Sequence, residues 1–340
     1  MAETPTERAT DNAPEPVAES SDTTELRANT QITAGAPGDD DDNEQDDADS
    51  AIGDDSVSST ASLSSSIMEY RLLHGRTFHS AKHETEYWGP NDDRQCESMD
   101  IKYVTQPIQS PGRDAYEFIC SHHFLTLSID GKLHLAPLKD DIEKVLDVGT
   151  GTGLWAIDFA DTHPDTEVIG TDISPIQPVW CPPNLTFEID DVMQDWTFAP
   201  NTFDYIHIRY MLGSIQDWPR LFKQAYRALK PGGYVESYES EPHYMSDDDT
   251  VKPDSAMATW TKLFAEGGRK LGRPFTILSD DLQRKGIEEA GFVDIEVTNN
   301  KAPIGGWAQD PKLQEIGQYA QLALEQDLEG NDRNVPNRTP

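Results

Sequence analysis

The stretch Val145-Leu146-Asp147-Val148-Gly149-Thr150-Gly151-Thr152-Gly153 holds the most information about the fold of this 340-residue chain. An apolar run ends in an acid, a Gly-x-Gly-x-Gly turn follows, and the apolar segment 154–160 comes directly after it. This order predicts a buried strand, a tight turn and a helix start, the arrangement with which parallel sheets receive nucleotide-like ligands. A dinucleotide-binding turn needs a third glycine where this chain has Leu154, which argues against NAD.

Two further acids end the next expected strands, Asp172 after 167–171 and Asp191 after 185–189. The carboxyl ends of parallel strands form the ligand edge of an open sheet, so we expect both acids to lie there with Asp147. Asp172 is expected to accept hydrogen bonds from the two hydroxyls of a ribose, and Asp191 from an adenine amino group. The turn has no Gly-Lys-Ser/Thr sequence, which excludes a triphosphate-binding loop.

From about residue 70 to residue 297, the chain resembles the class I S-adenosylmethionine-dependent methyltransferases. The segments 203–208 and 229–234 resemble the fourth and fifth strands of that family. A closer resemblance, to the fungal LaeA-like group of secondary-metabolism regulators, rests on His74–His79, Gly131–Leu135 and Gly170–Pro175. The resemblance implies S-adenosylmethionine as cofactor and methyl transfer as the reaction, and it leaves the acceptor open.

The expected cofactor site has roles for more residues than the strand-end acids. Gly149, Gly151 and Gly153 let the backbone approach the methionine portion, and Val192 adds a backbone contact beside the adenine. Asp147 orients either the turn or the ammonium group of the ligand, directly or through water. The resemblance also implies that Tyr70, Arg76 or His79 closes over the cofactor carboxylate, with Arg76 as the best chemical match.

The sequence identifies no catalytic base with certainty. His207 in the expected fourth strand is either a core histidine or a proton acceptor, and His123, beside His122, is a second candidate. Arg209 and Tyr210 hold a substrate carboxylate or cap the strand. Asp204 at the start of the strand is read equally well as a turn acid or a site residue, and no set of residues predicts a metal site.

Charge and cysteine content limit the classes of partner. The chain has 62 Asp and Glu against 27 Lys and Arg, a net charge of -35, which speaks against nucleic-acid binding and favours small molecules or basic proteins. Its first 55 residues are strongly acidic and predict a disordered tail or a docking arm for a basic partner. The cysteines, at 96, 120 and 181, predict neither a disulfide framework nor a zinc site. No leader peptide or membrane span is expected, which predicts a cytoplasmic or nuclear protein.

The expected organisation is a doubly wound, Rossmann-like α/β sheet with an added N-terminal cap. The predicted regions are a disordered acidic and Ser-rich part over 1–66, a helical cap over 67–140, the cofactor-binding core over 141–300, and a C-terminal helix with a polar tail over 301–340. Cap helices are expected over 67–74, 94–105 and 115–127, and core helices over 219–229, 282–290 and 311–324. Strands are expected at 144–148, 167–171, 185–189, 203–208, 233–238 and 293–298, and no segment fits the family's seventh strand.

Four functional readings follow from these patterns. The first is an active methyltransferase acting on a small molecule or a protein. The second is a cofactor-binding regulatory module that works through protein partners with little turnover. A shortened, poorly folding relative comes third, because an open sheet edge invites aggregation. An NAD-dependent oxidoreductase comes last.

Overall fold

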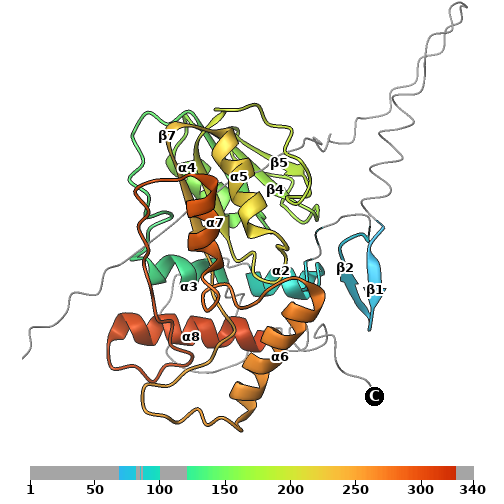
Figure 1. The fold of residues 1–340 in the computed structure, drawn as a ribbon, viewed down its shortest axis with the longest axis vertical. Helices are drawn as coiled ribbons and strands as arrows, with labels where there is room; N and C mark the ends of the chain where they lie inside the picture. Colours follow the sequence, from blue (N-terminus) through green and yellow to red (C-terminus); the bar gives the residue numbers. More distant parts are fainter. Residues whose placement is uncertain (1–68, 82–84, 86, 100–120, 327–340) are drawn as a thin grey trace, which may run out of the picture.

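The computed structural model describes residues 69–81, 85, 87–99 and 121–326 (Figure 1). The predicted disordered region 1–66, its Ser-rich end and the polar tail from residue 327 lie outside the described residues. Parts of the expected cap helices 94–105 and 115–127 also lie outside them.

The core is a sheet of five parallel strands in the order β5-β4-β3-β6-β7. The strands are β3 (Lys144–Val148), β4 (Glu167–Asp172), β5 (Leu185–Ile189), β6 (Phe203–Arg209) and β7 (Leu229–Tyr238). The chain enters at the central strand β3, builds outward through β4 to β5, and returns to place β6 on the other side of β3. This order confirms the doubly wound sheet and puts its switch point between β3 and β6, where such sheets bind ligands.

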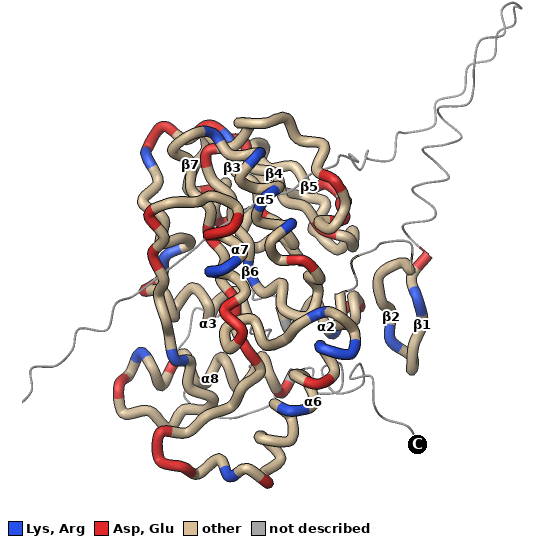
Figure 2. Tube along the Cα trace, in the orientation of Figure 1, with Lys and Arg blue, Asp and Glu red and all other residues tan. Residues whose placement is uncertain are grey.

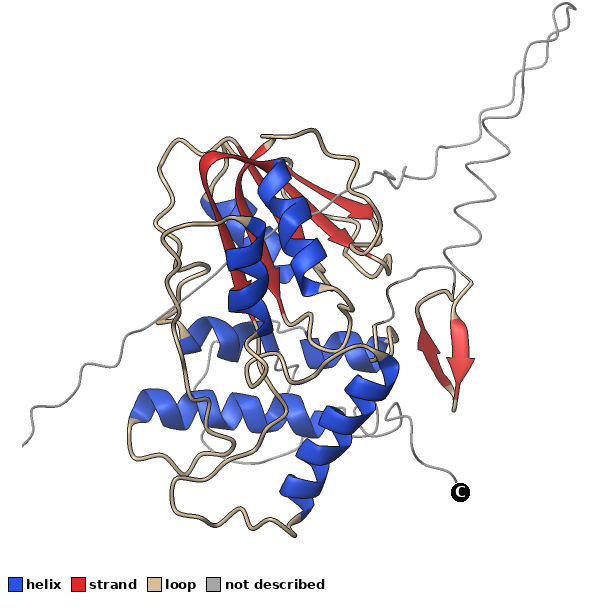
Figure 3. Ribbon diagram, viewed as in Figure 1, coloured by secondary structure: helices blue, strands red, loops and turns tan. Residues whose placement is uncertain are grey.

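Helices cover both faces of this sheet (Figures 1 and 3). The helices of the core and C-terminal region are α4 (Leu154–Thr162), α5 (Trp218–Ala228), α6 (Ala256–Leu271), α7 (Leu282–Ala290) and α8 (Pro311–Gln326). Helices α5 and α7 lie side by side over one face, where they share a core cluster with β6, and α4 packs in a second cluster that covers the other face. The cap contributes α2 (Asp93–Met99) and α3 (Ser121–Ser128).

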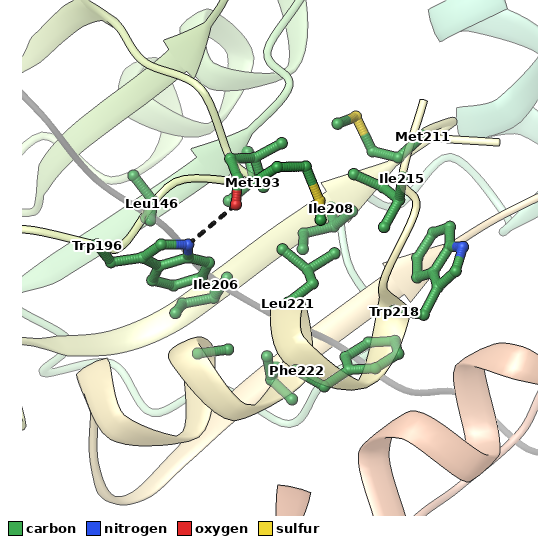
Figure 4. Packing of buried hydrophobic residues seen from close by; sticks show 14 of the residues in the cluster. Leu146, Met193, Trp196, Ile206, Ile208, Met211, Ile215, Trp218, Leu221 and Phe222 are labelled. Carbon is green, nitrogen blue, oxygen red and sulfur yellow. Dashed lines mark hydrogen bonds between the residues drawn. The ribbon is translucent and has the colours of Figure 1, made fainter. Parts of the chain in front are cut away.

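Helix α5 shows how the sequence builds the larger core cluster. Asp217 caps the helix by accepting a hydrogen bond from the Arg220 backbone N–H at 2.9 Å, and Pro219 occupies the first turn. One apolar face then points at the sheet, and Figure 4 shows Leu221 and Phe222 packed towards Ile206. Burying each such side chain stabilises the fold by about 1.5–3 kcal/mol.

Three expectations about secondary structure were wrong at this level. The first concerns the strand expected at 233–238, which begins earlier and includes Pro231-Gly232-Gly233. The helix ends at Ala228 and β7 begins at the next residue, so these residues lie inside the strand, where its pairing with β6 shifts register. Gly232 has a φ of 80°, which fits a bulge near the start of an edge strand.

The expected helix over 67–74 is instead an antiparallel hairpin of β1 (Arg71–Leu73) and β2 (Arg76–Phe78). Its turn residues His74 and Gly75 both have positive φ values, 51° and 81°, as a two-residue hairpin turn requires. Local turn chemistry therefore outweighs the apolar spacing that suggested a helix, and the predicted helical cap contains a hairpin beside its helices.

The expected sixth strand over 293–298 is irregular, with an isolated bridge at Val297. Gly291 ends α7 with a φ of 100°, and Asp294 has a φ of 55°, so the chain turns twice where a strand would extend. Within the described residues the sheet ends at β7 and has no seventh strand either. The intervening helix α6, which the sequence analysis did not anticipate, packs Phe264 against Trp88 and Phe275 beside the sheet.

Candidate cofactor and acceptor site

The glycine turn lies between β3 and α4 with little space to spare on two sides. A Cβ atom on Gly153 would lie 2.4 Å from Cζ of Phe187, and one on Gly149 would lie 2.2 Å from Sδ of Met211. Both glycines also have positive φ values, 86° and 65°, which other residues adopt at a cost. Above Gly151 the nearest atom to such a Cβ is Sδ of Met99 at 3.8 Å, an ordinary contact distance, so α2 covers the turn on this side without crowding it.

Asp147 is buried at the end of β3 and both of its oxygens have partners. Oδ1 lies 2.7 Å from Nδ1 of His207, and Oδ2 accepts a hydrogen bond from the Thr150 hydroxyl at 2.6 Å. A carboxylate only accepts hydrogen bonds, so the His207 ring donates from Nδ1. Asp147 therefore orients the glycine turn, one of the two roles that the sequence analysis left open for it.

Asp172 ends β4 and ties that strand to the turn. Its Oδ2 accepts from the Gly151 backbone N–H, and its Oδ1 accepts from the Ser174 backbone N–H, both at 2.9 Å. Desolvation by the surrounding protein raises the pKa of Asp172 to about 6, although the side chain keeps some solvent exposure. Each oxygen retains a second lone pair, which is what an acceptor for ribose hydroxyls requires.

Asp191 lies after β5 and is more enclosed. The backbone N–H and the hydroxyl of Thr85 both donate to its carboxylate, and the Met193 N–H donates to Oδ1 at 3.0 Å. The adjacent Val192 is buried, and its carbonyl accepts from Nε1 of Trp196 at 3.2 Å (Figure 4). The sequence predicted this acid at the ligand edge, but it did not indicate that the segment before α2 reaches it.

Arg76 forms an ion pair with Asp92. Its guanidinium group makes two hydrogen bonds to the Asp92 carboxylate, and the Arg76 side chain is mostly buried. Asp92 in turn accepts from the Gln95 backbone N–H at 3.1 Å in the first turn of α2. The guanidinium therefore fastens α2 to the β1–β2 hairpin, and the contact with a cofactor carboxylate that the resemblance implied stays a prediction.

His207 is enclosed on the face of β6 that α4 covers. Its ring stacks on Trp155 with 3.7 Å between ring centroids and 6° between the planes. Burial lowers the pKa of His207 to about 4, although the hydrogen bond that the ring donates to Asp147 acts in the opposite direction. The ring is therefore neutral at pH 7 and a weak base in this state.

A second histidine connects β6 to two helices. His122 on α3 accepts at Nδ1 from the Arg209 guanidinium at 2.8 Å, and its Nε2 donates to Asp158 on α4 at 3.1 Å. Burial lowers the pKa of His122, which keeps the ring neutral and able to accept from Arg209. His123 points elsewhere and meets Tyr319 of α8 edge to face at 4.5 Å between centroids.

Two buried glutamates near the carboxyl end of β7 were not anticipated by the sequence analysis. Glu236 accepts from the backbone N–H groups of Leu135 and Ala136, at 2.8 Å and 3.0 Å to one oxygen. Glu239 accepts from those of Met211 and Leu212 at 2.8 Å and 3.0 Å. Burial raises the pKa of Glu236 to about 7 and that of Glu239 to about 8. The sequence signal that could have revealed them was the presence of acidic residues at and just after the end of a core strand.

Asp204 is at the opposite end of β6 from the ligand edge. It accepts from the backbone N–H groups of Glu143 and Lys144 and from the Lys230 ammonium group, each at 2.9 Å. This arrangement joins the starts of three strands and makes Asp204 a structural acid.

The residues around the turn fit S-adenosylmethionine. Among the described residues, the side chains that hydrogen-bond to 147–153 from outside it are those of Thr171, Asp172, Gln177 and His207, and no Lys or Arg is among them. This acidic, glycine-lined site suits a ligand with a ribose, an amino group and a positive charge, and it does not suit a polyphosphate. No group of three or more His, Cys, Asp or Glu in the described parts of the chain could hold a metal ion.

Comparisons with known proteins agree with this geometry. The model of the methyltransferase domain family matches residues 120–296, just over half of the chain. The chain therefore belongs to this family, and it is an S-adenosylmethionine-dependent methyltransferase.

Its relatives include fungal proteins of secondary metabolism. The chain is 39% identical over 276 residues to methyltransferase pytC of Aspergillus terreus, which covers 81% of this chain and 78% of that protein. It is 36% identical over 228 residues to the secondary metabolism regulator LAE1 of Cochliobolus heterostrophus, covering 66% and 73%. Among solved structures, a phosphoethanolamine N-methyltransferase of Haemonchus contortus has a TM-score of 0.40 and 23% identity, over 63% of this chain and 47% of that one.

Proposed function

We propose that this methyltransferase acts on a small aromatic molecule in secondary metabolism. The observation that carries the proposal is a cluster of aromatic and apolar side chains at the carboxyl ends of β6 and β7. Tyr210 and Tyr238 pack there with Phe124 and Leu125 of α3 and with Ala320 of α8. Aromatic walls of this kind bind flat, weakly charged ligands.

The tyrosines of this wall are neutral. Burial raises the pKa of Tyr238 to about 12 and raises that of Tyr210 as well, and the Tyr210 hydroxyl donates to Oγ of Ser240 at 3.1 Å. The carboxylates that act on the pKa values of these tyrosines, Glu236 and Glu239, are buried and accept from backbone N–H groups, so the wall favours a small molecule over a basic protein. In Figure 2, Lys and Arg are interspersed with Asp and Glu along the described trace, and no helix among those described is long and apolar enough to cross a membrane.

The cofactor would supply an activated methyl group on a sulfonium, so the protein mainly has to hold two reactants in line. In this proposal Gly149, Gly151 and Gly153 border the methionine portion. Asp147 holds the turn beside that portion, Asp172 takes the ribose, and Asp191 with Val192 takes the adenine.

His123 and His207 stay our two candidates for removing a proton from the acceptor, and the structure favours His123. His207 has its Nδ1 proton directed at Asp147, is 2% exposed and has a pKa near 4, so it is enclosed and weakly basic. His123 lies beside Tyr319, next to the aromatic wall, and is less enclosed, although burial also lowers its pKa. An effect of His123→Ala on kcat that exceeds the effect of His207→Ala would support this assignment.

The test measures S-adenosylhomocysteine formation by the full chain, with a panel of phenols and aromatic acids and a parallel panel of basic proteins. Turnover with an aromatic compound that is lost in Asp172→Ala supports the proposal. Turnover confined to the protein panel contradicts it.

The similarity to LAE1 supports one other function, a regulatory module that binds the cofactor and acts through protein partners. Cofactor binding without turnover on either panel, together with a stable protein complex, would establish that alternative. Both functions fit a reducing compartment, the cytoplasm or nucleus, and Cys181 is a free thiol.

A further inference from the structure

The segment before α2 and α2 itself contact all three cofactor elements of the sheet. Thr85 donates two hydrogen bonds to Asp191, Asn91 donates from Nδ2 to Oγ of Ser174 at 3.3 Å, and Met99 lies over Gly151. Ser174 is the residue whose backbone N–H holds Asp172. The residues between 85 and 99 that the structure describes thus form a wall over the site. This wall is not part of the glycine turn or of the acids at the ends of the strands.

One atom of this wall has no partner. Asn91 is 7% exposed, its Nδ2 is used by Ser174, and its Oδ1 makes no hydrogen bond with any described residue. Buried amide oxygens are paired in the great majority of native structures, because an unpaired one loses its hydration without compensation. An orphaned acceptor beside a ligand site is explained when the ligand supplies the donor.

The position of Asn91 is fixed by its neighbours. Its backbone N–H donates to the Thr77 carbonyl of β2 at 2.9 Å, and the next residue, Asp92, is held by the two hydrogen bonds from Arg76. The hairpin therefore holds the amide against the loop that follows β4. Arg76 acts on the site through this arrangement as a positioning residue.

From these contacts we infer that Asn91 is a cofactor-binding residue whose Oδ1 accepts a hydrogen bond from a ribose hydroxyl of S-adenosylmethionine. This inference rests on the proposed cofactor site, because it places Asn91 beside Asp172. A ribose presents two hydroxyl donors, and Asp172 already uses one lone pair of each oxygen for backbone N–H groups. A third acceptor from the N-terminal wall completes the recognition of the ribose and links cofactor binding to that wall.

The experiment titrates the full chain calorimetrically with S-adenosylhomocysteine and with its 2′-deoxy and 3′-deoxy analogues. For Asn91→Ala, we expect an approximately tenfold loss of affinity for S-adenosylhomocysteine. The wild-type protein should bind one of the two deoxy analogues more weakly than S-adenosylhomocysteine, and we call this difference in affinity the deoxy penalty. Asn91→Ala should lose this penalty. Asn91→Asp keeps the acceptor oxygen and should keep that penalty.

A matched control is Asn184→Ala, which removes another amide from a loop before β5. Asn184 donates from Nδ2 to the carbonyls of Ala160, His163 and Thr166, at the opposite edge of the sheet. It should lower the melting temperature and leave the affinity unchanged. An Asn91→Ala protein that binds like wild type, or that keeps the deoxy penalty, would overturn the inference. Failure of the wild-type protein to bind S-adenosylhomocysteine would instead contradict the cofactor site itself.

Discussion

The two halves of the sheet's carboxyl edge are held in place in different ways. On the β3–β4 side, Asp172 is fixed by backbone N–H groups of the glycine turn and of its own loop. On the β6–β7 side, Glu236 is fixed by residues about a hundred positions earlier, and Arg209 is fixed by His122 of the cap. The glycine turn with Asp172 is thus a local motif, whereas the acceptor half, and Asp191 through its contact with Thr85, depend on long-range contacts.

The strongest test of this difference uses one glycine from each half. In Gly153→Ala the new methyl group would meet Phe187, and in Gly213→Ala it would meet Phe275 at 2.1 Å, in both cases with a positive φ. We expect each change to lower the free energy of unfolding by about 2–3 kcal/mol, measured by urea denaturation. Only Gly153→Ala should also abolish S-adenosylmethionine binding by the remaining folded protein, and equal loss of binding in both variants would contradict the separation of the halves.

The next test removes one acid from each half. Asp172→Ala should weaken S-adenosylmethionine binding on the order of tenfold to a hundredfold, because a ribose acceptor and a support of the turn are lost together. Glu239→Gln should leave the cofactor affinity within about twofold and raise the KM for the methyl acceptor, because it loosens the Met211–Leu212 backbone. Calorimetry measures the first quantity and steady-state kinetics the second; a Glu239→Gln protein with lost cofactor affinity would show that the halves are coupled.

The pH dependence of stability should be dominated by the acceptor half above pH 6.5. Glu236 and Glu239 have pKa values near 7 and 8 in the folded protein because they are buried, so the folded state holds protons that the unfolded state has released. The free energy of unfolding should therefore fall, by roughly 2 kcal/mol, as the pH rises from 6.5 to 8. His207, with its pKa lowered to about 4, acts in the opposite direction and only below pH 6.5.

Glu239→Gln provides the check on this slope. The variant cannot release a proton, so its stability should vary less between pH 6.5 and 8 than that of the wild-type protein, in denaturation curves at matched ionic strength. An unchanged slope would show that Glu239 does not titrate in this window.

The smallest effect is expected from the loop that joins β4 to β5. Trp180 is 86% exposed and Val179 is fully exposed, although both follow the ribose acid closely in sequence. Trp180→Ala should change the free energy of unfolding by less than about 0.5 kcal/mol and leave the cofactor affinity unchanged. A clear loss of affinity would show that this loop also takes part in cofactor binding.

The same contrast explains what could be predicted from the sequence. Strands β3 to β6, helix α7 and the acids at the ligand edge follow from local patterns, namely apolar runs, a glycine turn and a Gly291 stop. The roles of Asp147, Asp172 and Asp191 towards the cofactor stay predictions, and their placement at the edge is what the structure adds.

The parts that escaped prediction depend on contacts between distant segments or on backbone angles. The hairpin at 71–78 depends on two consecutive residues with positive φ, and the irregular segment 293–298 is interrupted at Asp294. The partner of Arg76 and the buried setting of Glu239 could not be predicted, because neither Asp92 nor the Met211–Leu212 backbone carries a pattern that marks it as a partner.

The strand order also sets the sequence of events while the chain is being synthesised. Strands β3, β4 and β5 emerge first and contain the glycine turn and the three acids, whereas β6 and β7 follow later. At about 5–20 residues per second, the interval between the end of β5 and the end of β6, the strand that pairs with the other side of β3, is roughly 1–4 seconds. During that interval the inner edge of β3 has no partner strand, and an open edge with an apolar face is a template for pairing with another chain. The central strand of the finished protein is thus an edge strand in the nascent one, and its protection at that stage must come from the ribosome or from chaperones.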